Sequence, residues 1–396
     1  MSATLPHLEL DDETTELQSK YWGCENTSGL GEAPDALCPT PQSVVGQSHA
    51  KLLNLAYMRQ VVIEQLSGKN ITPMRSGTDF YLQIDKSVRG PVWNPLHSTL
   101  KTSRLLSWTT KMCAPSFSLP AGSKQIAGSC PGANAGQSIV SDKERKRAAE
   151  ILLPVLGVDQ IDLPKAVCQF CYASGGQYAT GGVQFHQIIR YAWTRRAIRE
   201  DMNGNVIIPG EEEKSVFVRV MTQAIENADF KINGAKGLSP EPDQGSGQRF
   251  FRLHDSGDFF ALQYFRCWKK IADHFKDIIF WTPSRIWTQG EKLINEISVI
   301  NGPAEASNLV IRPSGFHVNA PGPPRKNYNW SGWAGTTTVY QHASQAQAEG
   351  QDYDWNCKAY EVDKGPNCRD AVGENGEKGC RACWLHKDAR INYTLH

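Results

Sequence analysis

Short apolar segments alternate with helical segments through the second half of the chain, and this alternation constrains the fold more than any other feature. Arg249–Leu253, Asp277–Trp281 and Asn308–Ile311 have the length of strands and are apolar on both faces. The segments with helical spacing are Glu211–Asn227, Phe260–Phe275 and Glu291–Val299. Strands that are apolar on both faces and separated by helices are typical of a parallel sheet covered by helices, often closed as a barrel. The sequence therefore predicts an α/β fold.

Each of these three strands ends in polar residues. They are His254, Asp255, Ser256, Asp258, Thr282, Ser284, Arg285, Arg312 and Ser314. In parallel α/β folds the active site lies at the carboxyl ends of the strands. We therefore expect Asp255 and Arg285 to face a site, while Asp258 has an alternative role as the cap of the helix that follows.

Cysteines form a first group upstream of the sheet. Cys168 and Cys171 have C-x2-C spacing in the run A-V-C-Q-F-C-Y-A-S-G-G, and Cys130 stands before them in G-S-C-P. Three thiolates leave one metal position open for a ligand or substrate, whereas four close a structural site. Cys113 is either a fourth ligand or a small buried apolar residue.

A second group of cysteines lies near the end of the chain. Cys357 and Cys368 are followed by Cys380 and Cys383 in G-C-R-A-C-W. The surrounding segment has too few apolar residues to fold alone, and a bound metal would supply the missing stability. The spacing is compatible with structural Zn²⁺ and with an accessory [4Fe–4S] cluster. His386 is a spare ligand or a surface histidine.

Composition narrows the cellular setting. The net charge is +1, so no global basic field draws the protein to nucleic acid. The first residues contain no basic and apolar signal peptide, and no apolar run approaches the roughly 20 residues that cross a bilayer. We expect a soluble intracellular protein without membrane partners, in which the clustered cysteines among the 11 serve metal binding rather than disulfides.

Two basic helical segments flank the Cys168 loop. Asp142–Leu153 carries four Lys and Arg residues, and Gln184–Glu200 carries Arg190, Arg195 and two further arginines. Such runs are usually solvated faces. The alternative is a phosphate-binding surface.

The chain divides into three expected regions. Residues 1–110 are an N-terminal extension, 111–340 a barrel-like catalytic domain with the cluster loop, and 341–396 a cysteine-rich metal or cluster segment. Within the extension, roughly the first 50 residues look weakly structured. A helix is expected over Leu52–Gln65 and a strand over Asp79–Ile84.

Five motifs resemble the bacteriophage "gene product 88" family. They are P-S-F-S-L-P-A-G after Lys111, the C-P of Cys130, C-x2-C-Y-A from Cys168, F-R-L-H-D-S-G-D-F-F from Phe251, and the last C-x2-C-W. The resemblance covers about Lys111 to Trp384. Through C-x2-C-Y-A and the α/β alternation the family is also similar to radical S-adenosylmethionine (SAM) enzymes, which have a partial (β/α) barrel. Those enzymes usually carry C-x3-C-x2-C, whereas here the first cysteine lies far upstream.

The resemblance implies a set of functional residues. Cys130, Cys168 and Cys171 would hold a [4Fe–4S] cluster whose open iron binds SAM, with electrons from a donor such as a host flavodoxin. Tyr172 would lie beside the adenine. The other cofactor-binding candidates are Asp255, Ser256, Ser284 and Arg312, and the catalytic candidates are Asp255 and Arg285.

The expected reaction starts from a 5′-deoxyadenosyl radical that abstracts hydrogen from an unactivated carbon. In the cytoplasm of an infected host cell, the expected substrate is DNA or a modified nucleotide, with isomerisation of a hypermodified thymine as the candidate reaction. Basic helices could contact phosphates, and Trp281, Trp287, Trp330 and Trp333 could stack on an extruded base or be ordinary core residues.

Two other functions remain open on the sequence. The first is a non-catalytic, zinc-stabilised nucleic-acid-binding protein in which both cysteine groups are structural. The second is a metal-dependent nuclease that uses Asp255 and Asp258, although two carboxylates make a small ligand set.

Overall fold

The predicted strands form the centre of one large sheet. In the computed structural model, β6 (Arg249–Arg252), β7 (Ile278–Ser284) and β8 (Leu309–Val318) pair in parallel, with Phe251 opposite Phe280. The structure describes residues 70–85, 102–108, 114–122, 128–131, 167, 171, 173, 178, 180–228, 230, 249–319, 322–323, 328–340, 354–361, 368, 371 and 379–394. The predicted helices over 52–65 and 142–153 lie outside these ranges.

Five more strands extend this sheet to eight, in the order β10-β11-β9-β8-β7-β6-β5-β4. They are β4 (Ser107–Trp108), β5 (Pro115–Ser116), β9 (Thr337–Tyr340), β10 (Trp355–Asn356) and β11 (Ile391–Thr394). All neighbouring pairs are parallel except β4 with β5. In the described residues β4 and β10 are the two edges. The structure thus confirms the α/β class with a mostly parallel sheet, and a barrel is not shown in these residues.

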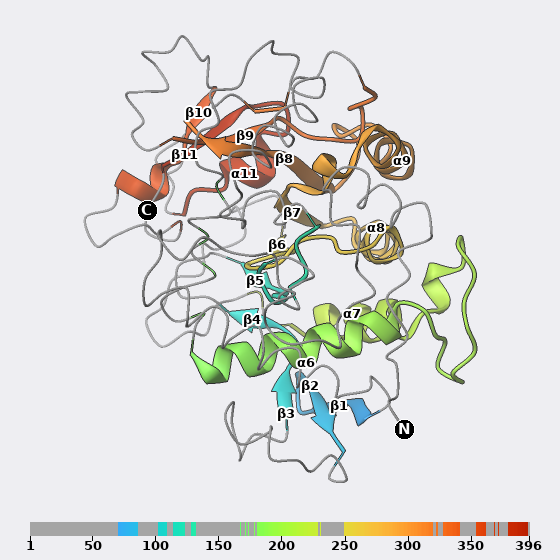
Figure 1. The fold of residues 1–396 in the computed structure, drawn as a ribbon. Coiled ribbons are helices and arrows are strands. Elements are labelled where there is room, and N and C mark those ends of the chain that lie inside the picture. The colour runs from blue at the N-terminus through green and yellow to red at the C-terminus, as the bar shows by residue number, and fades with distance from the viewer. Residues whose placement is uncertain are drawn as a thin grey trace, which may run out of the picture.

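The helices have the expected order along the chain. They are α6 (Gly181–Ala197), α7 (Val216–Glu226), α8 (Leu262–His274), α9 (Glu291–Asn301) and the short α11 (Ala382–Leu385). Short 3₁₀ turns are η8 (Glu212–Lys214), η9 (Ile286–Gln289) and η10 (Lys358–Glu361). In Figure 1 the sheet runs from β10 near the top to β4 below, with α8 and α9 to its right.

Alternate strand residues enter two different hydrophobic clusters. Phe251 and Phe280 face the helices and pack with residues such as Trp268 of α8. Phe250 and Trp281 point to the other face. Because successive side chains of a strand point to opposite faces, burial on both faces explains why these strands are apolar throughout.

The second face of the sheet is covered by the C-terminal segment rather than by a layer of long helices. Trp384 of α11 packs on Trp281 with ring centroids 5.0 Å apart, and its Nε1 donates to the Phe251 carbonyl over 3.0 Å. Strands β10 and β11 join the same sheet. The cysteine-rich segment is therefore part of the main architecture.

A three-stranded antiparallel sheet precedes the large one. It consists of β1 (Ile71–Ser76), β2 (Asp79–Ile84) and β3 (Thr102–Arg104), and β2 confirms the predicted strand. Its buried residues Phe80 and Leu82 belong to the same hydrophobic cluster as α6. Part of the predicted N-terminal extension thus contributes to the main core.

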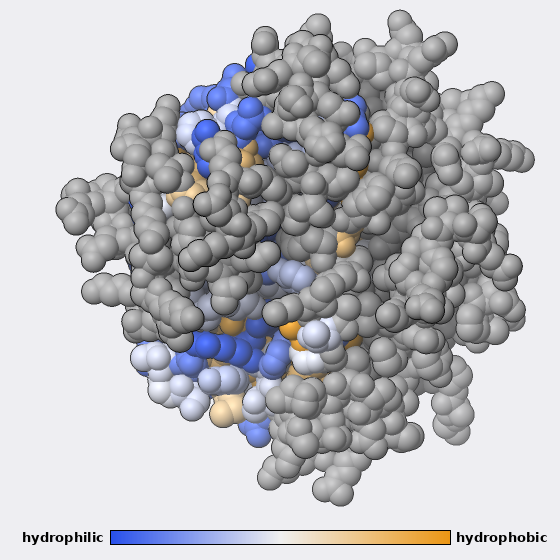
Figure 2. Space-filling model, turned by 90° about the vertical axis from the view of Figure 1, so that its left-hand side faces the viewer, coloured by the Kyte–Doolittle hydropathy of each residue, from blue (hydrophilic) through white to orange (hydrophobic). Residues whose placement is uncertain are grey.

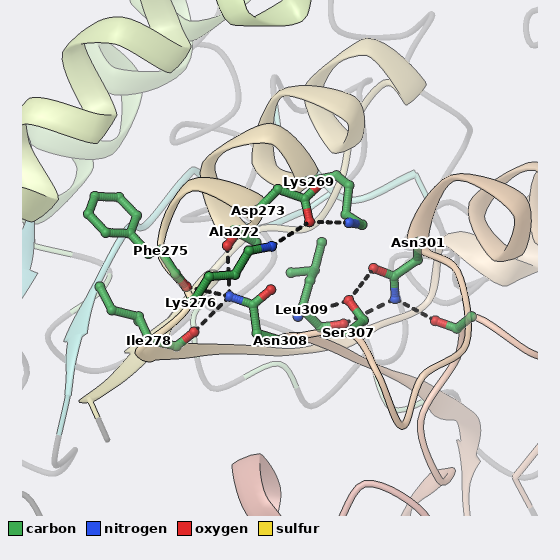
Figure 3. A network of polar contacts seen from close by, with 11 residues as sticks. Lys269, Ala272, Asp273, Phe275, Lys276, Ile278, Asn301, Ser307, Asn308 and Leu309 are labelled. Atoms are coloured by element: carbon green, nitrogen blue, oxygen red, sulfur yellow. Dashed lines mark hydrogen bonds and ion pairs between the residues drawn. The ribbon is translucent and has the colours of Figure 1, made fainter. Parts of the chain in front are cut away.

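Hydrogen bonds lock the amino ends of the central strands (Figure 3). Asn308 Nδ2 donates to the carbonyls of Ala272, Phe275 and Ile278 over 2.6–2.9 Å. These contacts join the end of α8 and the start of β7 to the start of β8. The carboxyl ends of these strands, where the predicted site residues lie, are at the other end of the strands.

The side of the molecule away from α8 and α9 is shown in Figure 2. Its described residues are mostly hydrophilic, and the hydrophobic ones form small separate areas. Within the described ranges, every helix is too short or too polar to cross a bilayer.

Candidate functional site

Asp255 lies in the turn that follows β6. Its side chain is almost completely buried, and its two oxygens accept hydrogen bonds from different segments. Arg252 Nη1 forms an ion pair with Oδ1 at 2.7 Å, and the Tyr178 hydroxyl donates to Oδ2. Asp255 therefore joins the loop that follows Cys171 to the carboxyl end of β6.

Ser256 joins two more segments to the same turn. Its hydroxyl donates to the Leu119 carbonyl at 2.6 Å and accepts from Gln187 Nε2 at 2.7 Å. The Leu119 amide donates back to the Ser256 carbonyl at 3.0 Å. Ser256, predicted to hold cofactor or substrate, is thus bonded on both sides to the protein.

Gly257 permits the close approach of the Cys130 segment. Its φ of 90° favours glycine, and an added Cβ would lie 2.5 Å from Ser129 Oγ and 2.8 Å from Leu119 Cβ. The backbone of Cys130 is held by a hydrogen bond of its amide to the Gly122 carbonyl at 2.9 Å. Cys130 therefore follows directly on a residue that touches the turn after β6.

One face of α6 contacts Tyr178 and the turn after β6, and lies near Cys130. Gln184 donates to the Tyr178 carbonyl, Gln187 donates to Ser256, and Tyr191 lies one turn further. Burial raises the pKa of Tyr191, Arg195 opposes this rise, and Cys130 adds to it, which places Cys130 near the helix. The spacing of three and four residues puts these side chains on one face.

Asp258 binds to the end of β7 and does not cap α8, whose N-cap is Ala261. Ser284 Oγ donates to Asp258 Oδ1 at 2.6 Å, and the Arg285 amide donates to Oδ2 at 2.8 Å. Burial raises the pKa of Asp258 to about 6 against the opposing effect of these bonds. A buried carboxyl with a raised pKa at the carboxyl ends of parallel strands is typical of functional sites.

Arg285 is oriented by the next strand. Its Nε donates to the Gly315 carbonyl of β8 at 3.0 Å, and the residue is partly exposed. Among the described residues no acceptor is found for its two Nη groups. Asp255, Ser256, Ser284 and Arg285 thus all lie at the carboxyl ends of β6 and β7.

Arg312 is placed differently from the other predicted site residues. It is fully buried, and its guanidinium donates to the carbonyls of Gly335, Cys383, His386 and Ala389. Burial lowers its pKa. The structure brings Arg312 to the C-terminal segment, where these bonds occupy its donors.

His254 is a core residue. Its ring nitrogens lie 3.1 Å from Thr282 Oγ1 and 3.1 Å from the Tyr264 hydroxyl. Burial, together with Arg252, lowers its pKa to about 3. The imidazole is neutral at physiological pH and couples β6 to β7 and α8.

The first cysteine group is only partly described. Cys130 and Cys171 are half-buried, whereas Cys113, Cys168 and Tyr172 lie outside the described residues. Within the described ranges, no three His, Cys, Asp or Glu side chains are already spaced to hold a metal ion. A triad that includes Cys168 is outside that search.

The four C-terminal cysteines are all described, and the Cys380 amide donates to the Cys368 carbonyl at 3.0 Å, but no three of them lie at the spacing of a metal site. The Cys357 thiol donates a hydrogen bond to the Cys368 sulfur, which raises the pKa of Cys357 and lowers the pKa of Cys368. Burial raises the pKa of Cys383 to about 12, Arg312 opposes this, and Cys368 and Cys380 add to it. Cys383 Sγ also lies 3.1 Å from the Tyr393 hydroxyl.

The arginines of α6 are mostly engaged within the protein. Arg190 is buried, donates to the Arg104 carbonyl and to Ser107 Oγ, and burial lowers its pKa to about 9. Arg196 pairs with Glu200 at 2.7 Å, and the Arg195 guanidinium lies 5.8 Å from the centre of the Tyr191 ring. Arg190 is therefore no part of a phosphate-binding surface.

Sequence reasoning missed three residues that shape the site: Tyr178, Gln187 and Arg252. A strand arginine in an apolar run was the available signal for Arg252, because burying a cation requires a partner. Nothing in the sequence shows that Tyr178 reaches Asp255 across 77 positions.

Comparison with known proteins gives one match. A family model described as Gene product 88 matches residues 94–386. No curated protein and no solved structure matches the chain. The matched residues include both cysteine groups and the turns after β6, β7 and β8. On this match, which covers most of its length, the chain belongs to the Gene product 88 family.

Proposed function

We propose that the chain is an iron–sulfur enzyme that binds SAM, with a [4Fe–4S] cluster on Cys130, Cys168 and Cys171. The observation that carries this proposal is the convergence of two chain segments on the turn after β6. Ser129 touches Gly257, and Tyr178 binds Asp255. The sequence separates these cysteines widely, and the fold gives their segments a common anchor.

The residues present fit such a group in their chemistry. Thiolates are the ligands that iron–sulfur clusters prefer, and three of them leave one iron open. Cys130 and Cys171 are half-buried, so they combine access with a partly desolvated setting. With SAM bound, the cluster would supply one-electron cleavage of a C–S bond and a radical that abstracts hydrogen.

The protein's own residues then hold the reactants in place. Asp255, oriented by Arg252 and Tyr178, is a fixed negative charge for an ammonium or hydroxyl group of SAM or substrate. Arg285, oriented through Gly315, has Nη groups suited to a carboxylate or phosphate. Gln187 and Ser256 keep the turn rigid. Phe259 packs on His254 with ring centroids 4.9 Å apart, and both side chains are buried beneath the turn after β6.

The substrate in this proposal is a hypermodified thymine in phage DNA, and the reaction is an isomerisation. An isomer has the same mass as its parent nucleoside, so digestion of treated DNA should give a peak of unchanged mass and shifted retention. Arg195, partly exposed in the last turn of α6, is the cation of this helix that would contact phosphate.

The test is anaerobic purification with iron and sulfide analysis and EPR of the reduced protein. We expect a [4Fe–4S]⁺ signal that shifts when SAM is added. Cys130→Ser, Cys168→Ser and Cys171→Ser should each lose this signal. Cys267→Ala, which changes a buried cysteine of α8, should retain it. A protein with zinc and no iron would exclude the mechanism.

A further inference from the structure

Gln187, in the middle of α6, has a side-chain carbonyl that is buried without a hydrogen-bond donor. The residue is 2% exposed, and its Oε1 has no partner within the described residues. Buried polar groups in folded proteins are almost always paired with protein, water or a ligand. The carbonyl therefore calls for a donor that the described part of the chain does not supply.

The orientation of this amide is fixed by its neighbours. Ser256 Oγ donates its only proton to the Leu119 carbonyl at 2.6 Å, so it can only accept from Gln187. The atom of Gln187 that lies 2.7 Å from Ser256 Oγ must then be the donor Nε2. The acceptor Oε1 consequently lies on the other side of the amide, away from Ser256.

The free carbonyl belongs to the face of α6 that contacts the candidate site. Ser256 follows Asp255 in the turn after β6, and Gln184, one turn earlier on the helix, holds the Tyr178 carbonyl. The Tyr178 hydroxyl in turn donates to Asp255. These contacts connect Gln187 to both segments that hold the ligand in the proposed enzyme.

A buried water explains the free carbonyl less well than a ligand does. Such a water needs two to four polar partners. The Ser256 hydroxyl is already bonded to Leu119 and to Gln187, and the Leu119 amide donates to the Ser256 carbonyl at 3.0 Å. The polar groups described at this turn are thus engaged with one another, so a donor on a bound molecule fits better.

We propose that Gln187 Oε1 accepts a hydrogen bond from the 6-amino group of adenine and so selects the adenosyl group of SAM. This inference rests on the proposed function. A neutral amide carbonyl suits a neutral amino group, whereas the ammonium group of SAM is better matched by the carboxylate of Asp255.

The occupied Nε2 makes the selection specific. Glutamine side chains read the same edge of adenine in nucleic acids, where they both donate and accept. Because Ser256 takes the donor, Gln187 offers this edge only an acceptor. An acceptor pairs with the 6-amino group of adenine and is repelled by the 6-oxygen of hypoxanthine or guanine.

The experiment is calorimetric binding of two SAM analogues to the anaerobically purified full-length protein. S-adenosylhomocysteine carries the 6-amino group, and S-inosylhomocysteine carries an oxygen in its place. Wild type should bind the adenine compound about 10- to 100-fold more tightly, because the other compound leaves a buried acceptor unpaired. Gln187→Met removes the acceptor and should bind both compounds with similar affinity.

The ratio of the two dissociation constants isolates the contact. Gln187→Met also loses the bond to Ser256, but that loss affects both compounds and cancels in the ratio. Gln187→Glu should keep the discrimination, because a protonated carboxyl can donate to Ser256 and still present an acceptor oxygen. Gln263→Met, which changes a partly buried glutamine of α8, should behave as wild type does.

The outcomes separate this inference from the enzyme proposal. Wild type that binds S-adenosylhomocysteine and the inosine compound equally would overturn the role of Gln187 and leave the enzyme proposal standing. This measurement needs only wild type, so a variant that does not fold cannot block it. The same ratio in wild type and Gln187→Met would also overturn the role. Binding of neither compound would overturn SAM binding, and this inference with it.

Discussion

Asp258 shows how a carboxyl group can be both well bonded and electrostatically strained. It accepts from Ser284 Oγ and from the amides of Phe259 and Arg285 at 2.6–2.8 Å. Burial nevertheless raises its pKa from 3.8 to about 6. The folded protein therefore binds this proton more tightly than the unfolded chain does. The contribution to stability is largest below the unfolded pKa and is lost as the pH rises through 6.

We expect Asp258→Asn to remove this pH dependence. Between pH 5 and 7.5 the wild-type free energy of unfolding should fall by about 1.4 kcal/mol relative to the variant, from the two pKa values. Urea unfolding at several pH values measures it. Asp277→Asn is the control, because Arg249 lowers the pKa of Asp277 and its titration lies below this range. Parallel curves for wild type and Asp258→Asn would contradict the expectation.

Arg285 should bind an anionic group of the ligand. Arg285→Gln is expected to weaken SAM or substrate binding by about 10- to 100-fold, because a charge-assisted hydrogen bond contributes roughly 1.5–3 kcal/mol. Calorimetric titration measures the dissociation constant. The matched control is Arg249→Gln, whose side chain pairs with Asp277 at 2.7 Å at the amino end of β6. An equal loss in both variants would argue against a specific contact at Arg285.

At the scale of elements, helix α6 contacts several of the segments that form the candidate site. Its glutamine side-chain amides bind the Tyr178 carbonyl and Ser256, and its Arg190 binds Arg104 of β3 and Ser107 of β4. Helical spacing predicts such a helix from sequence, but the partners of its polar face come from other segments. The helix therefore acts as a common support for loops that are distant in the chain.

The amino ends of the strands should contribute stability without contributing to function. Asn308→Ala removes bonds to three carbonyls and is expected to lower the free energy of unfolding by about 1–3 kcal/mol. Iron content and the response to SAM should stay at wild-type levels. Asn203→Ala, in an exposed turn, is the control with little expected effect on the urea midpoint. A loss of the SAM response in Asn308→Ala would show that the two ends of the sheet are coupled.

At the scale of the molecule, the sheet is covered by unlike layers. Helices α8 and α9 cover one face, and a segment with four cysteines and one short helix covers the other (Figure 1). Arg252 connects this second layer to the candidate site. It pairs with Asp255 at 2.7 Å, lies 5.3 Å from the centre of the Trp281 ring, and helps to lower the pKa of Cys368.

Trp384 should anchor the second layer. It is 1% exposed and packs on Phe250 and Trp281. Trp384→Ala is expected to cost about 3–5 kcal/mol of unfolding free energy, as large-to-small core substitutions do. Leu385→Ala changes the neighbouring, 42% exposed residue and should have a small effect. Denaturant unfolding of both variants measures the difference, and equal midpoints would show that Trp384 does not hold the layer.

Several elements follow from the sequence because their signals are local. The apolar runs at Arg249, Asp277 and Asn308 predicted parallel strands, and their polar ends predicted that Asp255, Ser256, Ser284 and Arg285 lie at the carboxyl ends of these strands. Arg312 also ends such a run, yet its side chain is buried against the C-terminal segment. Strand position determines which residues lie near a strand end, but packing determines where each side chain goes.

The sequence by itself determined the parallel α/β order, the two cysteine groups and the family. Periodicity and spacing are properties of neighbouring residues, so they can be read without the fold. Only the tertiary structure decided the order of the eight strands, that the C-terminal segment covers the second face of the sheet, and that Ser129 and Tyr178 meet the turn after β6. These contacts join residues far apart in the chain, and their free energy depends on burial and hydrogen bonds that exist only once the layers pack.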